Sequence, residues 1–165
     1  MADPRLAAAR IRYNYACGYC GVTEISTGSL LTLDHYQPRA AGGDDADDNL
    51  VYACIKCNQN KHAFWPTPEE RMKGIRVLHP LSDETNHHFA EDEHGYLQPL
   101  TTTGNFHIAL LDLNRPQLVQ HRLARQIQRT LIEKVASLEE QEKTLQNRFS
   151  ALEQTIVMLE AFLRR

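Results

Sequence analysis

The chain has 165 residues and a formal net charge of −3, from 18 lysines and arginines against 21 aspartates and glutamates. This length suits one compact domain with an extension, or two small units. The charge excludes a general positive field, so an anionic substrate has to be met by local cations or by metal ions. The sequence shows no signal-peptide pattern and no apolar run of membrane-spanning length, and we expect a soluble, cytoplasmic protein without a membrane partner.

The cysteines form two Cys-x-x-Cys pairs, Cys17 with Cys20 and Cys54 with Cys57. Each such turn directs two sulfur atoms to one ion, so the four together predict a tetrahedral, structural Zn²⁺ site. The alternatives are a redox-active pair, which leaves the second pair unexplained, and free cysteines of the core. Since four thiolates leave no open position for water on the ion, a reactive centre is expected elsewhere.

The residues between the two cysteine pairs predict a strand, a long loop and a second strand. Residues 29–36 and 49–54 are apolar and β-prone, whereas residues 39–48 have the Gly-Gly and Asp content of a loop. Residues 55–64 contain no glycine or proline and predict a helix that ends before Pro66. The pattern therefore predicts a ββα unit that is braced by the zinc ion.

Asp34 and His35 are adjacent at the end of the first predicted strand, and Asn58 follows the last cysteine. Hydrolysis of a phosphodiester needs a base that takes a proton from water and a cation that offsets charge on the phosphoryl oxygens. Histidine suits the first role near neutral pH, and Asp34 and Asn58 offer oxygen ligands for Mg²⁺ or Mn²⁺. Neighbouring side chains of a strand reach one site only where the strand ends or bends. Taken singly, such an Asp-His pair is more often a surface ion pair, and such an Asn a cap.

The stretches CGYC, LDHYQPRAAGG, NLVYAC and CNQNK follow one another within residues 17–61, and this region resembles the HNH endonuclease family. The resemblance implies a ββα-metal motif in which His35 is the general base and Asp34 is a metal ligand. It implies that Asn49 orients the base and its loop. Asn58 stands where a histidine is more familiar, which resembles the H-N-N variants and favours Mg²⁺ or Mn²⁺ as the catalytic ion.

The resemblance implies a metal-dependent endonuclease that hydrolyses DNA. It also implies a candidate effector of a bacterial anti-phage defence assembly, in which an ATPase or another subunit supplies specificity. Arg39, Lys56 and Lys61 are the nearby cations expected to contact the DNA backbone, and a solvated surface position is the alternative for each. His62 is a further candidate metal ligand. The competing function is a zinc-braced interaction module, or structural subunit, that acts through the C-terminal helix.

Residues 67–115 predict short strands and loops, around Gly95 and Gly104, that pack on the unit formed by residues 1–66. Five of the eight histidines lie in this segment: His79, His87, His88, His94 and His107. Their spacing matches no metal motif, and we expect ordinary surface or core residues.

Residues 116–165 contain no glycine and, after Pro116, no proline, and they predict one long helix. Apolar residues alternate there at spacings of three and four: Leu131, Val135, Leu138, Leu145, Phe149, Leu152, Ile156, Leu159 and Leu163. Glu142 interrupts this stripe. We expect a coiled coil with a second copy (a homo-oligomer) or with a different protein, and a helix folded back on the globular part is the alternative. The predicted class is thus α+β, a small zinc-braced ββα-metal domain followed by a long C-terminal helix.

Overall fold

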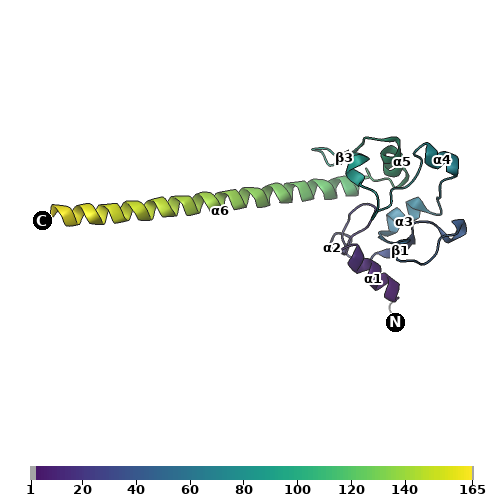
Figure 1. Cartoon of the computed structure of the whole chain (residues 1–165), viewed down its shortest axis with the longest axis horizontal. Coiled ribbons are helices and arrows are strands. Elements are labelled where there is room, and N and C mark those ends of the chain that lie inside the picture. The colour runs from purple at the N-terminus through teal and green to yellow at the C-terminus, as the bar shows by residue number, and fades with distance from the viewer. Residues whose placement is uncertain (1–2, 165) are drawn as a thin grey trace. The chain divides into compact units, whose positions relative to one another are not determined.

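The chain begins with two helices, continues through a ββα unit and a second pair of short strands, and ends in one long helix. The computed structural model describes residues 3–164 (Figure 1). In chain order the elements are α1 (Pro4–Arg12), α2 (Glu24–Thr27), β1 (Thr32–His35), η1 (Arg39–Ala41), β2 (Leu50–Ala53), α3 (Ile55–Lys61), α4 (Pro68–Met72), η2 (Thr85–His87), β3 (Phe89–Glu91), β4 (Leu97–Pro99), α5 (Thr102–Leu110) and α6 (Pro116–Leu163). The chain divides into a first compact unit that ends at Leu123 and a second that begins at Ala124.

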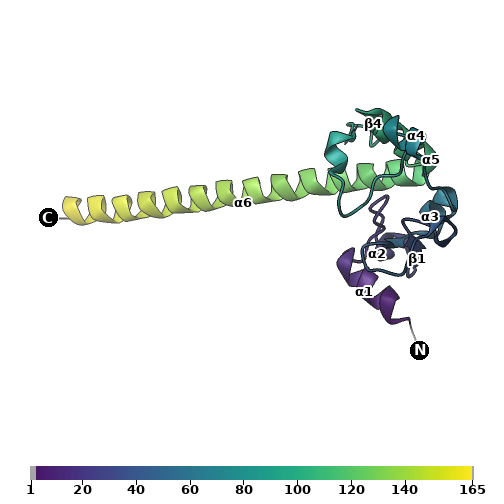
Figure 2. The same cartoon turned by 45° about the vertical axis from the view of Figure 1, so that its right-hand side comes forward.

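The predicted ββα unit is present in the first compact unit. β1 and β2 pair antiparallel, with Asp34 opposite Val51, and α3 begins directly after its N-cap Cys54. β2 is buried along its whole length, where Val51 and Tyr52 are β-prone side chains that suit a covered strand. α1 packs against both strands and α3 packs against β1. Figures 1 and 2 show α1, β1 and α3 in the same part of the chain from two directions. The end of β1 is thereby placed beside α3.

The helix expected to reach towards Pro66 ends earlier, at Lys61. His62 has a positive φ of 49°, a left-handed conformation that cannot continue an α-helix. Its backbone N–H still donates to the carbonyl of Asn58 at 2.9 Å, which closes the last turn. Lys61 is therefore the last residue of the helix, on the side that faces the end of β1.

The middle segment contains two short strands, as expected near Gly95, and two α-helices that were not predicted, α4 and α5. β3 and β4 pair antiparallel around Gly95. The expectation of a strand near Gly104 is wrong, because this residue lies within α5. The Thr101 hydroxyl accepts a hydrogen bond from the Gly104 N–H at 3.0 Å, and it caps the helix there. A side chain at position 104 would collide with the carbonyl of His88, so glycine allows α5 to lie against this turn.

One core joins the ββα unit to the middle segment and to the start of α6. Buried apolar residues from all three regions belong to the same cluster: Leu31, Val51, Tyr52, Val77, Leu97, Ile108, Leu111, Leu113 and Leu118. Arg122 of α6 is also buried, and its guanidinium donates to the carbonyl oxygens of Gly95 at 2.6 Å and Leu113 at 2.8 Å. The first turns of α6 are therefore part of the first unit.

The long C-terminal helix is confirmed, and α6 runs without a break from Pro116 to Leu163. The apolar residues of its stripe are exposed in the single chain, from 50% for Leu138 to 81% for Leu163. None of the described helices combines the length and the apolarity needed to span a membrane.

Candidate functional site

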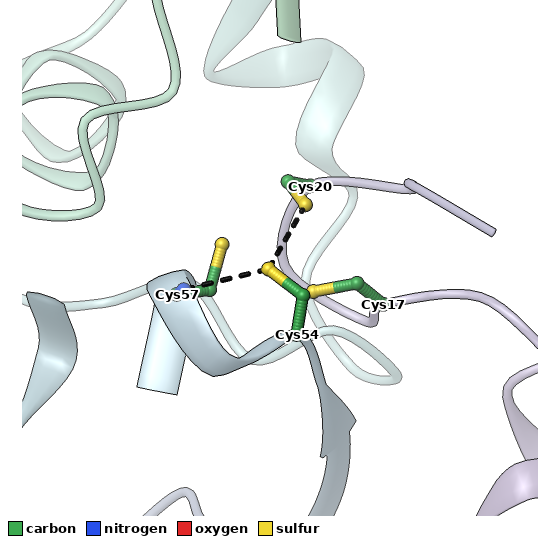
Figure 3. Close-up of side chains that lie close together, drawn as sticks. All are labelled: Cys17, Cys20, Cys54 and Cys57. Carbon is green, nitrogen blue, oxygen red and sulfur yellow. Dashed lines mark hydrogen bonds between the residues drawn. The ribbon is translucent and has the colours of Figure 1, made fainter. Parts of the chain in front are cut away.

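The four cysteines converge on one point at the start of α3 (Figure 3). Their Sγ atoms all lie within 4.8 Å of one another, and those of Cys20 and Cys54 are 3.8 Å apart. Sulfurs held tetrahedrally at about 2.3 Å from a zinc ion are separated by about 3.8 Å. The cluster is thus positioned for one metal ion, and four thiolates are the ligand set of a structural zinc site.

Backbone hydrogen bonds shape the turn that carries the first cysteine pair. The Cys17 N–H donates to the carbonyl of Val22 at 2.9 Å, and the Gly21 N–H donates back to the carbonyl of Cys17 at 2.8 Å. Gly21 has a φ of 73°, which glycine adopts without strain. The Gly18 N–H donates to the carbonyl of Tyr52 at 2.8 Å and so ties this turn to β2. The turn therefore holds the sulfurs of Cys17 and Cys20 beside β2, which leads directly into Cys54 and the start of α3.

Arg115 is a residue of this metal centre that sequence reasoning missed. Its guanidinium donates to the Sγ atoms of Cys54 at 3.7 Å and Cys57 at 3.8 Å. It also donates to the carbonyl of Leu111 at 3.1 Å, which fixes its direction. Four thiolates around a divalent ion carry excess negative charge, and a neighbouring guanidinium stabilises them. An arginine 58 residues after Cys57 carries no local signal of this role.

Asp34 lies in a buried ion pair at the end of β1. Its carboxylate accepts a hydrogen bond from the Tyr19 hydroxyl at 2.6 Å, and the Lys61 ammonium lies 3.1 Å from the same oxygen. Lys61 also donates to the carbonyl of His35 at 2.6 Å. Burial raises the pKa of Asp34, and the Lys61 ammonium opposes that shift. Burial lowers the pKa of Lys61, and Asp34 opposes that shift in turn.

The position of Lys61 differs from the expected contact with a DNA backbone. Its side chain is only 1% exposed, because the end of α3 directs it back into β1 rather than outwards. There it holds the Asp34 carboxylate and the main chain of His35 together. Lys61 therefore fixes the positions of Asp34 and His35 from the buried side of β1.

His35 is the last residue of β1 and is half-buried. Its Nε2 lies 2.7 Å from the Asp45 carboxylate, while the Arg39 Nε is more distant from the same nitrogen, at 3.3 Å. A carboxylate only accepts, so we assign the ring proton to Nε2 and the free lone pair to Nδ1. The bond from His35, and then the Arg39 guanidinium, hold the pKa of Asp45 below its ordinary value. Asp45 was predicted only as part of a solvated loop.

Asp34, His35 and Asn58 line one open pocket of about 480 Å³, together with Arg39 and His62. Adjacent residues of a strand normally face opposite ways, but β1 ends at His35, which allows both residues to reach this pocket. Asn58, from α3, lines the same pocket. The structure thus brings together the base and both oxygen ligands that the sequence suggested. His62, which follows α3 directly, lines this pocket as well.

Asn49 acts on the loop beside His35. Its side-chain oxygen accepts from the Gln37 N–H at 2.7 Å, and its side-chain nitrogen donates to the carbonyls of Gln37 at 3.1 Å and Asp44 at 2.7 Å. A side chain at Gly43 would collide with the Gln37 carbonyl, so the loop closes tightly around the amide. Asn49 therefore joins the two ends of the loop that presents Asp45 to the histidine.

The other two cations expected to contact DNA, Arg39 and Lys56, line different pockets. Arg39 stands at the rim of the pocket with 63% of its side chain exposed. Lys56 lines a different pocket, next to Cys54 and Arg115, so the structure does not bring it to His35.

Among the middle-segment histidines, His107 is a core residue. Its Nδ1 accepts a hydrogen bond from the Leu78 N–H at 3.0 Å, and burial lowers its pKa to about 4. It is therefore neutral near pH 7 and serves as an acceptor in the core.

Replacing Lys61 with methionine should lower the free energy of unfolding of the first unit by about 3 kcal/mol, near the low end of the cost of breaking a buried ion pair. Methionine retains most of the apolar stem but leaves the buried Asp34 carboxylate without its counter-charge, while the Tyr19 bond remains. Denaturant unfolding followed by the fluorescence of Trp65 measures the change. Lys56→Met, in the exposed part of the same helix, is the matched control and should stay within about 0.5 kcal/mol of the parent. Equal effects of the two substitutions would contradict this assignment.

Comparisons with known proteins identify the segment that builds this pocket. Residues 17–64 match the family model described as HNH endonuclease. The chain is similar to a Septu protein PtuA of Bacillus mycoides, with 28% identity over 137 residues, which covers 67% of this chain and 19% of that protein. It is also similar to a CRISPR-associated endonuclease Cas9 of Corynebacterium diphtheriae, with 34% identity over 86 residues, 49% of this chain and 8% of that protein.

A third relative carries a name of a different kind, serine hydroxymethyltransferase of Hyphomonas neptunium, and is 35% identical over 101 residues, 60% of this chain and 22% of that protein. The chain therefore spans less than a quarter of the length of each of these relatives. No solved structure is significantly similar to it.

Proposed function

Residues 17–64 belong to the HNH endonuclease family, and from that premise we propose that the chain is a metal-dependent endonuclease that hydrolyses phosphodiester bonds of DNA. The observation that supports this most strongly is the pocket shared by Asp34, His35 and Asn58. A base and two oxygen ligands that face one solvent-open space are what phosphodiester hydrolysis requires. The pocket also has Arg39 at its rim, where a phosphate group can be met by a guanidinium.

In this proposal His35 accepts the proton of the attacking water through Nδ1. Its other nitrogen donates to Asp45, which fixes the ring and stabilises the imidazolium formed after proton transfer. Asn49 holds the ends of the loop that carries Asp45, so it positions the base without touching the substrate. The buried Lys61 holds the His35 main chain from the other side.

Asp34 and Asn58 would hold the catalytic divalent ion. Carboxylate and amide oxygens are the ligands that Mg²⁺ and Mn²⁺ prefer, and the pocket leaves room for the waters that such ions keep. When bound, the ion offsets negative charge on the phosphoryl and leaving oxygens. The Lys61 ammonium beside the Asp34 carboxylate opposes a second cation, so we expect this ion to exchange readily, unlike an ion at the cysteines.

The setting of the nuclease is also part of the proposal. The chain carries a net charge of −3, and among the predicted DNA-binding cations only Arg39 reaches the pocket, so the domain alone should bind DNA weakly. A partner that holds DNA would raise the effective concentration of substrate. Similarity to a CRISPR-associated endonuclease supports a role in antiviral defence. We therefore place the chain as the nuclease of a defence assembly, with an ATPase or another subunit supplying specificity.

Cleavage of supercoiled plasmid by the purified full-length protein tests this proposal. With added Mg²⁺ or Mn²⁺ we expect nicked or linear DNA, and no product when the ion is omitted from protein that keeps its zinc. Products that DNA ligase reseals would carry 5′-phosphate and 3′-hydroxyl ends, as the family resemblance implies. A matched RNA substrate tests the choice of nucleic acid. The protein is used in large excess over the substrate, so that weak binding does not limit cleavage. If neither nucleic acid is then cut with any divalent ion, the nuclease proposal is wrong and an interaction module is favoured.

A further inference from the structure

From Leu131 onwards, α6 carries leucine at every seventh position: Leu131, Leu138, Leu145, Leu152 and Leu159. Four residues after each leucine comes a second set: Val135, Glu142, Phe149, Ile156 and Leu163. In a heptad abcdefg the leucines occupy d and the second set occupies a. Leucine at d, combined with β-branched residues such as Val135 and Ile156 at a, favours two parallel strands. Each apolar member of the two sets is at least 50% exposed in the single chain.

The charges that flank this seam fit a second copy of the same helix. In a parallel, in-register pair, each g residue faces the e residue five positions later on the other chain, and opposite charges there set partner and orientation. Lys134 and Arg148 are the charged g residues, and the e residues five positions later are Glu139 and Glu153. Both cations therefore face a glutamate of the second copy.

An antiparallel pair does not use these charges, and a lone helix offers an opposite charge only to Glu139, from Lys143 four residues later. Within one helix, ion pairs form between residues three or four positions apart. No residue at those distances from Lys134, Arg148 or Glu153 carries the opposite charge. In an antiparallel pair, e faces e and g faces g, which would set glutamates against glutamates and cations against cations. The charge pattern is self-complementary only when the two helices run in the same direction.

We propose that residues 131–163 form a parallel, in-register, two-stranded coiled coil with a second copy of this chain. These 33 residues make a helix about 50 Å long. They amount to nearly five heptads, more than the three to four that indicate a coiled coil. Glu142 is the polar a residue within it. Against its own copy it costs stability, but any shifted register sets it against an apolar side chain, so it fixes the register. Because the helices are parallel, both chains enter the coil at the same end.

The last heptad contains apolar residues that would favour other partners for this helix. Val157, Met158 and Phe162 lie outside the a and d positions and are at least 65% exposed. Two strands leave them open, whereas further copies or a different protein would cover them. The number of chains in the assembly therefore decides the proposal.

Light scattering and sedimentation of the full-length, zinc-loaded protein at about 10 µM provide the test. We expect twice the chain mass of 18.9 kDa. Lys134→Glu combined with Arg148→Glu makes both charged g–e contacts, those with Glu139 and Glu153, repulsive and should weaken the dimer at least about tenfold at low salt. Glu139→Lys combined with Glu153→Lys should do the same. An equimolar mixture of the two variants restores opposite charges at each contact and should restore the dimer.

Arg129→Glu combined with Lys143→Glu is the matched control. It changes the net charge by the same amount as the first variant, but at outward-facing b positions, and should leave the dimer intact. A parent protein that is monomeric, or that exceeds two chains, would overturn the proposal, and so would equal weakening by the control. Failure of the mixed variants to associate would also overturn it. Helix content and bound zinc, measured on every variant, separate loss of pairing from loss of folding, and none of these readouts depends on cleavage.

Discussion

Replacing His35 with alanine should slow plasmid cleavage by about 10²- to 10⁴-fold under single-turnover conditions, the usual contribution of a positioned general base. The side chain lies at the end of β1 and contacts Asp45 instead of the apolar core, so folding and zinc content should stay close to those of the parent. Cleavage is followed with protein in excess over plasmid and saturating Mg²⁺ or Mn²⁺, so that product release does not limit the rate.

Two further variants make this result specific. His87→Ala removes a histidine that is 69% exposed and outside the pocket, and it should cut at the parent rate. Asp45→Asn retains the size of the side chain but loses the negative charge beside His35, so it should give a smaller loss and should alter the dependence of rate on pH. If His35→Ala cuts as fast as the parent, the base is assigned to the wrong residue, although metal-dependent cleavage by the chain would still stand.

The parts of the fold that were predictable depend on short stretches of sequence. β1, β2 and the start of α3 follow from apolar runs bounded by glycine, aspartate and cysteine, which encode strands and a cap within a few residues. The cysteine cluster was predictable because each pair is local and because only one ion is needed to join the two. The long α6 follows from an uninterrupted helical period.

The residues and roles that were not predicted depend on contacts made after folding. Lys61 was expected to contact the DNA backbone, and only the packing of α3 on β1 turns it towards Asp34. Asp45 lies in an acidic run in which each member appears equally solvated, until Asn49 folds the loop over the histidine. Arg115 reaches the cysteines from a loop far along the chain. Side-chain partners at such separations leave no periodic or local signal.

α5 shows the same limit for secondary structure. Glycine at position 104 favours a turn on propensity alone, since it costs about 1 kcal/mol within a helix. The Thr101 cap and the close approach of the His88 carbonyl reverse that preference. A tertiary contact that excludes any side chain thus decides the local structure, and it is apparent only once η2 and α5 are in place.

Removal of the zinc ion should unfold the first unit and abolish cleavage altogether. Binding at a four-thiolate site is worth on the order of 10 kcal/mol, which is comparable to the whole stability of a small domain. Cys54 and Cys57 are also members of the core, so the ion connects the N-terminal turn to the helix that carries Asn58 and Lys61. Cys57→Ser should therefore purify with little zinc and without the native fluorescence of Trp65. Trp65 is the single tryptophan, and its ring centroid lies 5.5 Å from that of Tyr36.

A graded variant and a chelation experiment separate zinc from a simple packing effect. Arg115→Ala retains all four ligands but removes the donors to Cys54 and Cys57, so zinc affinity should fall by about 10- to 100-fold, as with other residues that support metal ligands. After treatment of the parent with a strong zinc chelator, added Zn²⁺ should restore the Trp65 fluorescence, and Mg²⁺ should not, because thiolates bind the softer ion. Retention of native fluorescence and cleavage by protein without zinc would show that the cysteine cluster does not stabilise the fold through a metal ion.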